Sequence, residues 1–281
     1  MTVTVSTLTC GWLTGSASGF LDGEPGVMRV PVLSFLVEHP KGRVLFDSGL
    51  AAELADDTAA AGRMAELFEM DFGRQDAIDR RLSAAEVCEA GDIAVLVNSH
   101  LHFDHCGGNA LVPNARVVVQ AAEWRAGHHE KLVASDTYSP ALFDIGQDVQ
   151  LIDGEHDLFG DGRVVCIPTP GHTPGHQSLR VRTDHGEVVL CGDACYLRKA
   201  LDELHLPDFA WNKEQQLASL HALAALEAAG AQLFFGHDPC SGHRCPTPGA
   251  APPLSGLSVA TVTAGSGGSA RRAGGPTGPG P

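Results

Sequence analysis

The chain alternates short apolar runs with turn residues and with stretches whose apolar positions recur at helical spacing. Apolar runs bounded by Gly, Pro, Asn or Asp predict strands, and Pro40-Lys41-Gly42 marks a turn between two of them. Together these runs predict strands at residues 2–8, 30–39, 42–46, Ile93–Val97, Arg116–Gln120, Val149–Ile152, Arg163–Ile167, Gln177–Arg182, Glu187–Leu190 and Gln232–Phe235.

Five stretches predict helices, two of them a short piece that starts at Gly107-Gly108-Asn109 and a region with Trp124, His128 and His129. Residues 51–81 have helical character, Ser83 to Glu86 has the spacing of a capping box, and Lys213–Ala229 is apolar on one face. Strands and helices recur throughout, and no internal repeat is visible. The pattern therefore predicts a layered α/β protein with one domain at residues 1–240.

The composition changes sharply near the C-terminus. From Pro246 onward, 16 of 36 residues are Gly or Pro, and the only charged residues are Arg271 and Arg272. Such a segment buries too little apolar surface to offset its ordering entropy. We therefore expect residues 241–281 to form a Gly/Pro-rich, disordered tail.

Charge and composition restrict the classes of binding partner and the location expected for the protein. The net charge of −15 disfavours nucleic acid and anionic membranes as partners. No membrane-spanning segment or signal peptide is visible, so a cytoplasmic location is expected. None of the eight cysteines forms a C-x-x-C pair, which predicts scattered reduced thiols.

The candidate chemistry centres on the segment His100-Leu101-His102-Phe103-Asp104-His105, which follows a buried strand. In an extended loop, His100 and His102 face the same way, and Asp104 and His105 can turn toward a second position. Imidazole nitrogens and carboxylate oxygens suit zinc. The segment predicts a metal-binding loop.

Further ligand-type residues follow three later strands. Gly171 and the neighbouring prolines present His172, and Asp193 and His237 each follow a glycine at a strand end. His176 is expected to point into the next strand and to be structural. Together, these residues supply the ligands that a second metal needs.

Five segments carry a resemblance to a known family: LFDSG, NSHLHFDHCGGN, TPGHTPGHQSL, GDACY and FFGHD. From about Val3 to Asp238 the chain resembles the metallo-β-lactamase superfamily and, within it, the N-acyl homoserine lactonases. The resemblance implies an αββα four-layer sandwich and a metal-dependent hydrolase with two Zn²⁺ ions. It also implies a small-molecule lactone as the substrate.

The resemblance assigns roles to individual residues. It implies that His100, His102 and His172 hold one zinc ion, that Asp104, His105 and His237 hold the other, and that Asp193 bridges both. Asp47 of LFDSG resembles the aspartate that braces the metal loop.

The expected reaction is attack of a metal-bound hydroxide on the lactone carbonyl. Asp104 would pass a proton to the leaving alcohol. Tyr196, three residues after Asp193, resembles the tyrosine that stabilises the tetrahedral intermediate.

The substrate pocket is less sharply defined by the sequence. Phe68 and Phe72 are four residues apart, so they would share a helical face. They resemble aromatics that border an acyl-chain groove, although ordinary core packing fits them as well. Other apolar candidates for this pocket are Trp12, Phe20, Met28, Phe209 and Trp211.

Alternative functions remain open. The run VNSHLHFDHCGGN also resembles 4-pyridoxolactonase, whose substrate would need a small polar pocket rather than an apolar groove. A different class is a mononuclear iron sulfur dioxygenase, which would leave part of the ligand set idle. A loose group of His237, Cys240, His243 and Cys245 is interpreted as accidental.

Overall fold

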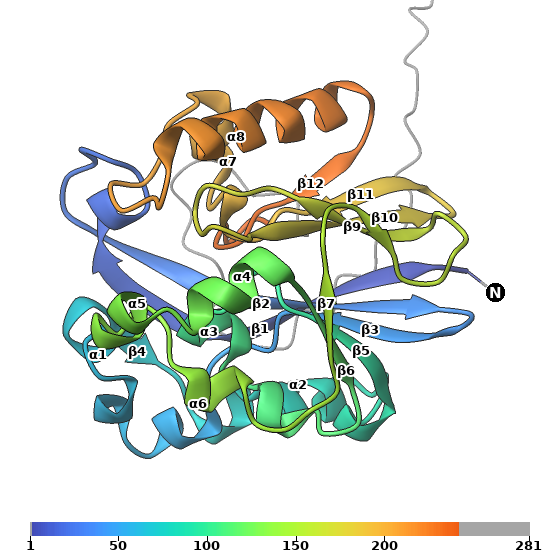
Figure 1. The fold of residues 1–281 in the computed structure, drawn as a ribbon, viewed down its shortest axis with the longest axis horizontal. Helices are drawn as coiled ribbons and strands as arrows, with labels where there is room; N and C mark the ends of the chain where they lie inside the picture. Colours follow the sequence, from blue (N-terminus) through green and yellow to red (C-terminus); the bar gives the residue numbers. More distant parts are fainter. Residues whose placement is uncertain (1, 242–281) are drawn as a thin grey trace, which may run out of the picture.

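The computed structural model describes residues 2–241 and contains two β-sheets stacked face to face. Helices cover the outer surface of each sheet (Figure 1). This arrangement is the αββα sandwich that the resemblance implied.

The larger sheet has seven strands. In spatial order they are β4 (Glu69–Asp71), β1 (Thr4–Ser16), β2 (Val27–His39), β3 (Gly42–Phe46), β5 (Ile93–Val97), β6 (Arg116–Gln120) and β7 (Val149–Ile152). The neighbouring pairs β4–β1, β1–β2 and β2–β3 are antiparallel, whereas β3, β5, β6 and β7 are parallel to one another.

The smaller sheet has five strands. In spatial order they are β12 (Gln232–Phe234), β11 (Gly186–Leu190), β10 (Gln177–Thr183), β9 (Val164–Pro168) and β8 (His156–Asp157). The sheet is antiparallel except that β11 and β12 are parallel, so β9, β11 and β12 run in the same direction.

An apolar core lies between the two sheets. Phe35 and Phe46 of the larger sheet pack with Phe234 of the smaller sheet, and all three are almost completely buried. Burial of such side chains contributes about 1.5–3 kcal/mol each relative to exposure. This core fixes the two sheets face to face.

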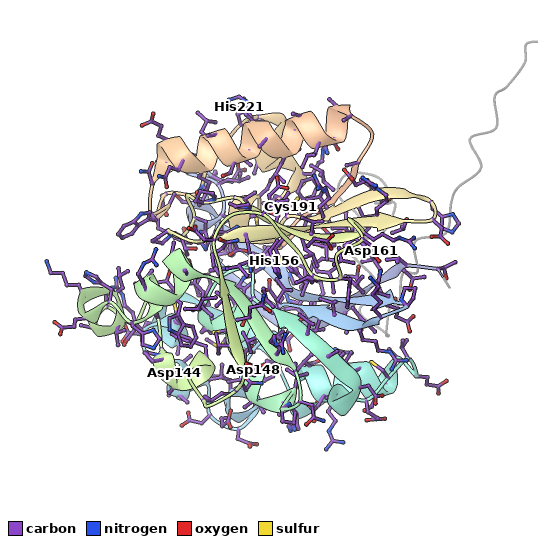
Figure 2. The ribbon with its side chains drawn as sticks, turned by 45° about the vertical axis from the view of Figure 1, so that its right-hand side comes forward. Asp144, Asp148, His156, Asp161, Cys191 and His221 are labelled. Carbon is purple, nitrogen blue, oxygen red and sulfur yellow. The ribbon has the colours of Figure 1, made fainter. Side chains whose placement is uncertain are left out.

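The outer layers contain the helices. They are α1 (Met64–Leu67), α2 (Ile78–Ala84), α3 (Phe103–Cys106), α4 (Ala121–Gly127), α5 (Glu130–Ala134), α6 (Pro140–Phe143), α7 (Arg198–Asp202) and α8 (Lys213–Ala228). Helix α8 begins after Asn212, whose side chain accepts a hydrogen bond from the Gln215 N–H. Figure 2 shows His221 on the outer face of α8. Cys191, which follows β11, lies below the helix on its inner side. The helix thus covers the smaller sheet, and its buried face is only partly apolar, because Gln216 and Ser219 are buried beside Leu220 and Leu223.

Two helix predictions are wrong. Residues 51–81 form short 3-10 turns, α1, the strand β4 and the start of α2 rather than one helical region. The expected capping box at Ser83 does not start a helix, because α2 ends at Ala84 and Glu86 has a positive φ of 55°. Such a φ breaks a right-handed helix at this point.

The remaining expectations concern the cysteines, membrane-spanning helices and the C-terminal tail. Cys10, Cys88, Cys106, Cys166, Cys191 and Cys195 are free thiols, but Cys240 is disulfide-bonded, so the expectation of reduced thiols throughout is wrong there. No helix among residues 2–241 is long and apolar enough to cross a membrane. The predicted tail lies, apart from Ser241, outside the described residues.

Candidate metal centre

The site lies where strands of both sheets end. Strands β3 and β5 are parallel, and Asp47 and His100 follow their carboxyl ends. On the other sheet, His172, Asp193 and His237 follow β9, β11 and β12. Parallel strands present their carboxyl ends at one edge of a sheet, which is where α/β proteins bind ligands.

The histidine loop bends at Ser99 and His100, has an extended backbone at His102 and then forms one helical turn, α3. This turn brings Asp104 and His105 to a second position beside the first two histidines, with the His105 ring 4.2 Å from the His100 ring. The loop lies tightly against residues 48–51, since a Cβ atom at Gly108 would lie 2.2 Å from the Ser48 carbonyl oxygen. Only glycine fits this close approach.

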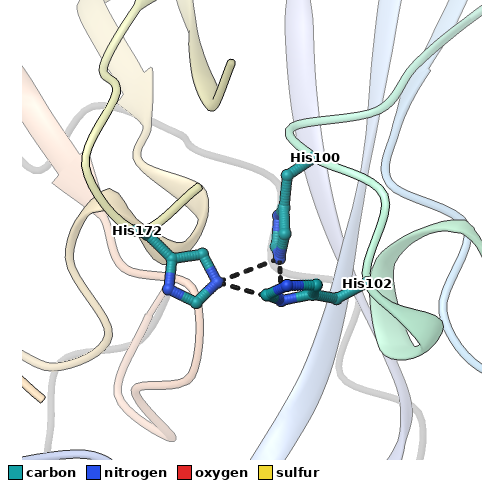
Figure 3. Close-up of side chains that lie close together, drawn as sticks. All are labelled: His100, His102 and His172. Atoms are coloured by element: carbon teal, nitrogen blue, oxygen red, sulfur yellow. Dashed lines mark hydrogen bonds between the residues drawn. The ribbon is translucent and has the colours of Figure 1, made fainter. Parts of the chain in front are cut away.

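Three imidazoles converge in a first group. Nε2 of His100 lies 2.9 Å from Nδ1 of His102, and Nε2 of His172 lies 3.1 Å from both atoms (Figure 3). Three nitrogen atoms from two loops that are 70 residues apart therefore point at one position.

A second group contains Asp104, His105 and His237. Oδ2 of Asp104 lies 3.5 Å from Nε2 of His105 and 3.6 Å from Nε2 of His237. This group resembles the first in having one member from the smaller sheet and two from the histidine loop.

Asp193 lies between the two groups. Its Oδ2 is 3.7 Å from Nε2 of His100 and 3.4 Å from Nε2 of His172. Its Oδ1 is 3.3 Å from Nε2 of His105 and 3.2 Å from Nε2 of His237. One carboxylate oxygen thus faces each group, which is the geometry of a bridging ligand.

Most of the imidazoles are oriented by hydrogen bonds at their outer nitrogen. Nδ1 of His105 lies 2.9 Å from Oδ2 of Asp47, and Nδ1 of His237 lies 2.8 Å from the Pro31 carbonyl oxygen. Nδ1 of His100 lies 2.9 Å from Oγ of Ser99, which donates to Asp47. Such contacts hold the inner nitrogen toward the centre.

Burial and nearby charges shift the pKa values of the histidines in opposite directions in the two ligand groups. Burial lowers the pKa of His100 and His172 well below the usual value and that of His102 to about 4, so these imidazoles are neutral with a free lone pair. Burial also opposes the charged form of His105, but Asp193, Asp104 and Asp47 outweigh it and raise its pKa. The second group therefore attracts positive charge.

The residues fit metal ions. His105 Nε2 and Asp193 Oδ1 are buried and point into the centre, where they lie 3.3 Å apart but complete no hydrogen bond. Metal ions bound to the two groups would satisfy both atoms, and imidazole with carboxylate is a donor set that suits zinc.

A pocket of about 480 Å³ opens onto the centre. Tyr196 lies at its inner end, where the phenolic oxygen is 3.3 Å from Nδ1 of His172. Of the aromatic candidates from the sequence, Phe20, Phe68, Phe209 and Trp211 line this pocket.

The remaining candidates lie elsewhere. Phe72 is packed in the core against Gly11, and β4 separates it from Phe68, so the expected shared helical face is wrong. Trp12 packs under the Arg29 guanidinium at 4.1 Å, and Met28 packs against the core.

Two further predictions concern the structural role of His176 and the loose group of histidines and cysteines near the end of the described residues. His176 is completely buried, and its Nδ1 lies 2.9 Å from Oγ1 of Thr169, as its structural interpretation predicted. His243 and Cys245 of the loose group lie outside the described residues.

Sequence reasoning missed Glu123 and Tyr138. Glu123 is completely buried behind the histidine loop and accepts a hydrogen bond from Tyr138, which lines the pocket. A single Glu in an alanine-containing helical stretch has no local signal for this role, because such residues are usually solvent-exposed.

Comparison with known proteins identifies the family of this chain. The profile of the metallo-β-lactamase superfamily matches residues 27–237. The N-acyl homoserine lactonase AttM of Azorhizobium caulinodans is 33% identical over 228 residues, covering 77% of this chain and 85% of the relative. The lactonase AiiA of Bacillus thuringiensis subsp. kurstaki is 28% identical over 225 residues, covering 76% and 84%.

A solved structure is also similar. It is an N-acyl homoserine lactone hydrolase with the product N-hexanoyl-L-homoserine bound at its catalytic metal centre. It matches with a TM-score of 0.76 and 27% identity and covers 85% of this chain and 95% of its own. The chain belongs to the metallo-β-lactamase superfamily and, within it, to the family of the N-acyl homoserine lactonases.

Proposed function

We propose that this protein is a dizinc lactonase that hydrolyses the ring ester of N-acyl homoserine lactones. The observation that carries the proposal is the position of Asp193, with one carboxylate oxygen toward each group of ligands, next to the Tyr196 hydroxyl at the end of an apolar pocket. Such a centre can act on a carbonyl carbon that enters from the pocket.

His100, His102 and His172 would hold one zinc ion, Asp104, His105 and His237 would hold the other, and Asp193 would contact both. A zinc pair supplies a nucleophilic hydroxide at neutral pH and polarises the carbonyl of the substrate.

Tyr196 is suited to donate a hydrogen bond to the developing oxyanion. Burial, Asp193 and Asp104 raise the pKa of its phenol well above the usual value, so it stays protonated. Because Nε2 of His172 faces the first group, its Nδ1 carries the proton and donates to the Tyr196 oxygen. The Tyr196 O–H is then free for the substrate.

Asp104 is placed to accept the proton of the attacking hydroxide once its oxygen has bonded to the carbonyl carbon, and to pass that proton to the ring oxygen as the ring C–O bond breaks. Its carboxylate is buried, faces the second group and lines the pocket. A single carboxylate in contact with both the centre and the pocket can hold that proton and release it to the substrate oxygen.

The lining of the pocket supports an acyl chain as the part of the substrate outside the lactone ring. Away from the centre its lining is largely apolar, with Phe68, Leu67 and Trp211 among the lining residues. A volume of about 480 Å³ falls in the range of small-molecule sites. A wide apolar pocket favours acyl homoserine lactones over the polar ring of pyridoxolactone.

A substrate panel with metal analysis tests the proposal. Acyl homoserine lactones of several chain lengths, pyridoxolactone, a thioester and a β-lactam would be assayed with purified protein of measured metal content. We expect about two zinc ions per chain and fastest turnover of acyl homoserine lactones. Preference for pyridoxolactone, or one iron per chain with no lactonase activity, would exclude the proposed function.

A further inference from the structure

Glu123 on α4 is a buried carboxylate outside the metal-binding groups. It has no exposed surface and forms no ion pair with any residue in the range 2–241. Burying a carboxylate without a cation costs several kcal/mol unless its oxygens accept hydrogen bonds. The partners of those oxygens therefore indicate what the residue does.

Three donors from three segments meet at this carboxylate. Oε1 accepts from the Leu101 N–H at 3.1 Å and from the Tyr138 hydroxyl at 2.9 Å. Oε2 accepts from the Gly175 N–H at 3.0 Å. Leu101 lies between His100 and His102, and Gly175 follows His172 by three residues. One side chain thus joins the two loops that supply the first group.

The contact between α4 and the second loop is close. A Cβ atom at Gly175 would lie 2.1 Å from the backbone nitrogen of Glu123. The loop backbone therefore rests directly on the start of α4, and the carboxylate sets its position from one side.

Tyr138 extends this connection to the pocket. Its ring lies 5.3 Å from the His102 ring, and it lines the pocket while its hydroxyl is directed to Glu123. Residues of the metal site and of the pocket wall therefore share one hydrogen-bond acceptor.

We propose that Glu123 is a positioning residue that fixes the two histidine loops relative to each other, so that the three imidazoles of the first group meet at metal-binding distance. Tyr138 couples the pocket wall to the same carboxylate. The inference rests on the metal role of His100, His102 and His172 and does not depend on which lactone is hydrolysed.

The test measures zinc affinity at each group separately. In a His237→Ala background only the first group is complete, and in a His172→Ala background only the second is complete. Competition with a chromogenic chelator gives the affinity in each, with and without Glu123→Gln. The glutamine keeps the volume but places an NH₂ group against a backbone N–H.

We expect Glu123→Gln to weaken zinc binding at the first group by about tenfold or more, and to leave the second group unchanged. The matched control is Glu130→Gln on the exposed surface of α5, which should change neither affinity. Thermal unfolding of the metal-free protein separates positioning from general destabilisation. Equal weakening at both groups, or no weakening at either, would overturn the inference.

Tyr138→Phe keeps both backbone hydrogen bonds to Glu123 and serves if Glu123→Gln does not fold. It removes one of the three donors, so we expect first-group zinc affinity to fall by about threefold, consistent with the loss of a single hydrogen bond. An unchanged first-group affinity in folded Tyr138→Phe protein would contradict the coupling. Neither readout requires lactone turnover, so failure of the proposed substrate would leave this test valid.

Discussion

The metal centre and the exposed apolar lining of the pocket are built in opposite ways. Side chains at the centre are mostly buried and fixed by neighbours, as Asp193 is 3% exposed and His100 is completely buried. We call the exposed apolar residues that line the pocket, Leu67, Phe209 and Trp211, the rim. They are 50%, 49% and 57% exposed.

The difference in burial reflects two tasks, which are catalysis at the metal centre and binding of an apolar chain at the rim. Catalytic groups must be held near productive geometry before the substrate arrives, which requires a packed and hydrogen-bonded surrounding. Apolar chains are bound by surface burial, which has little directional demand. We therefore expect substitutions at the centre to affect turnover strongly, and those at the rim to affect selectivity weakly.

The largest effect is expected from Asp193→Asn. It removes the charge that faces both groups, so lactone hydrolysis should fall by at least about a thousandfold, because several kcal/mol of transition-state stabilisation are lost. Zinc content, measured by elemental analysis, should drop below two ions per chain. Full activity in this variant would remove the proposed bridging role.

A smaller loss is expected from Tyr196→Phe. Removing the hydroxyl takes away one donor to the oxyanion, so kcat should fall by roughly a hundredfold. The zinc content should stay unchanged, because the phenol is not a ligand. Steady-state kinetics together with metal analysis checks both points, and loss of zinc would assign Tyr196 to the metal site instead.

Asp47→Asn tests the support behind the centre. Asp47 accepts hydrogen bonds from the Ser99 N–H, the Ser99 hydroxyl and His105, and the amide can satisfy only part of this set. Zinc affinity should fall by about ten- to a hundredfold. Asp148→Asn, on the protein surface (Figure 2), is the control and should bind zinc normally. A loss as small as that expected at the rim would contradict the proposed difference between the metal centre and the rim.

The smallest effect is expected at the rim. Trp211→Ala removes apolar surface, so KM for long-chain acyl homoserine lactones should rise by up to about tenfold, which corresponds to about 1.4 kcal/mol of lost burial. Short-chain substrates should be unaffected. Val27→Ala, at an exposed position that does not line the pocket, is the control. Equal changes for short and long chains would show that Trp211 acts on the centre.

The sequence predicted best where periodicity and ligand chemistry agree. Ile93–Val97 and Arg116–Gln120 match the strand bounds in the structure, and Lys213–Ala229 matches α8 to within one residue. The predicted metal residues are brought together because each follows a strand whose apolar pattern fixes its place in a sheet.

The sequence predicted least between the regular elements. In residues 51–81, alanine-rich composition suggests a helix, but tertiary contacts override this weak propensity and produce short turns and β4. Glu123 could not be identified, since its role depends on Leu101, Tyr138 and Gly175, which are distant in sequence. Long-range hydrogen bonds leave no local pattern.

Each ligand group takes members from both sheets: His100 and His102 with His172, and Asp104 and His105 with His237. Metal ions bound there would act as crosslinks between the two halves of the sandwich. Binding to the folded state alone raises its stability in proportion to the logarithm of free metal over the dissociation constant. Metal supply and resistance to heat or proteolysis should therefore rise and fall together in this protein, independently of any substrate.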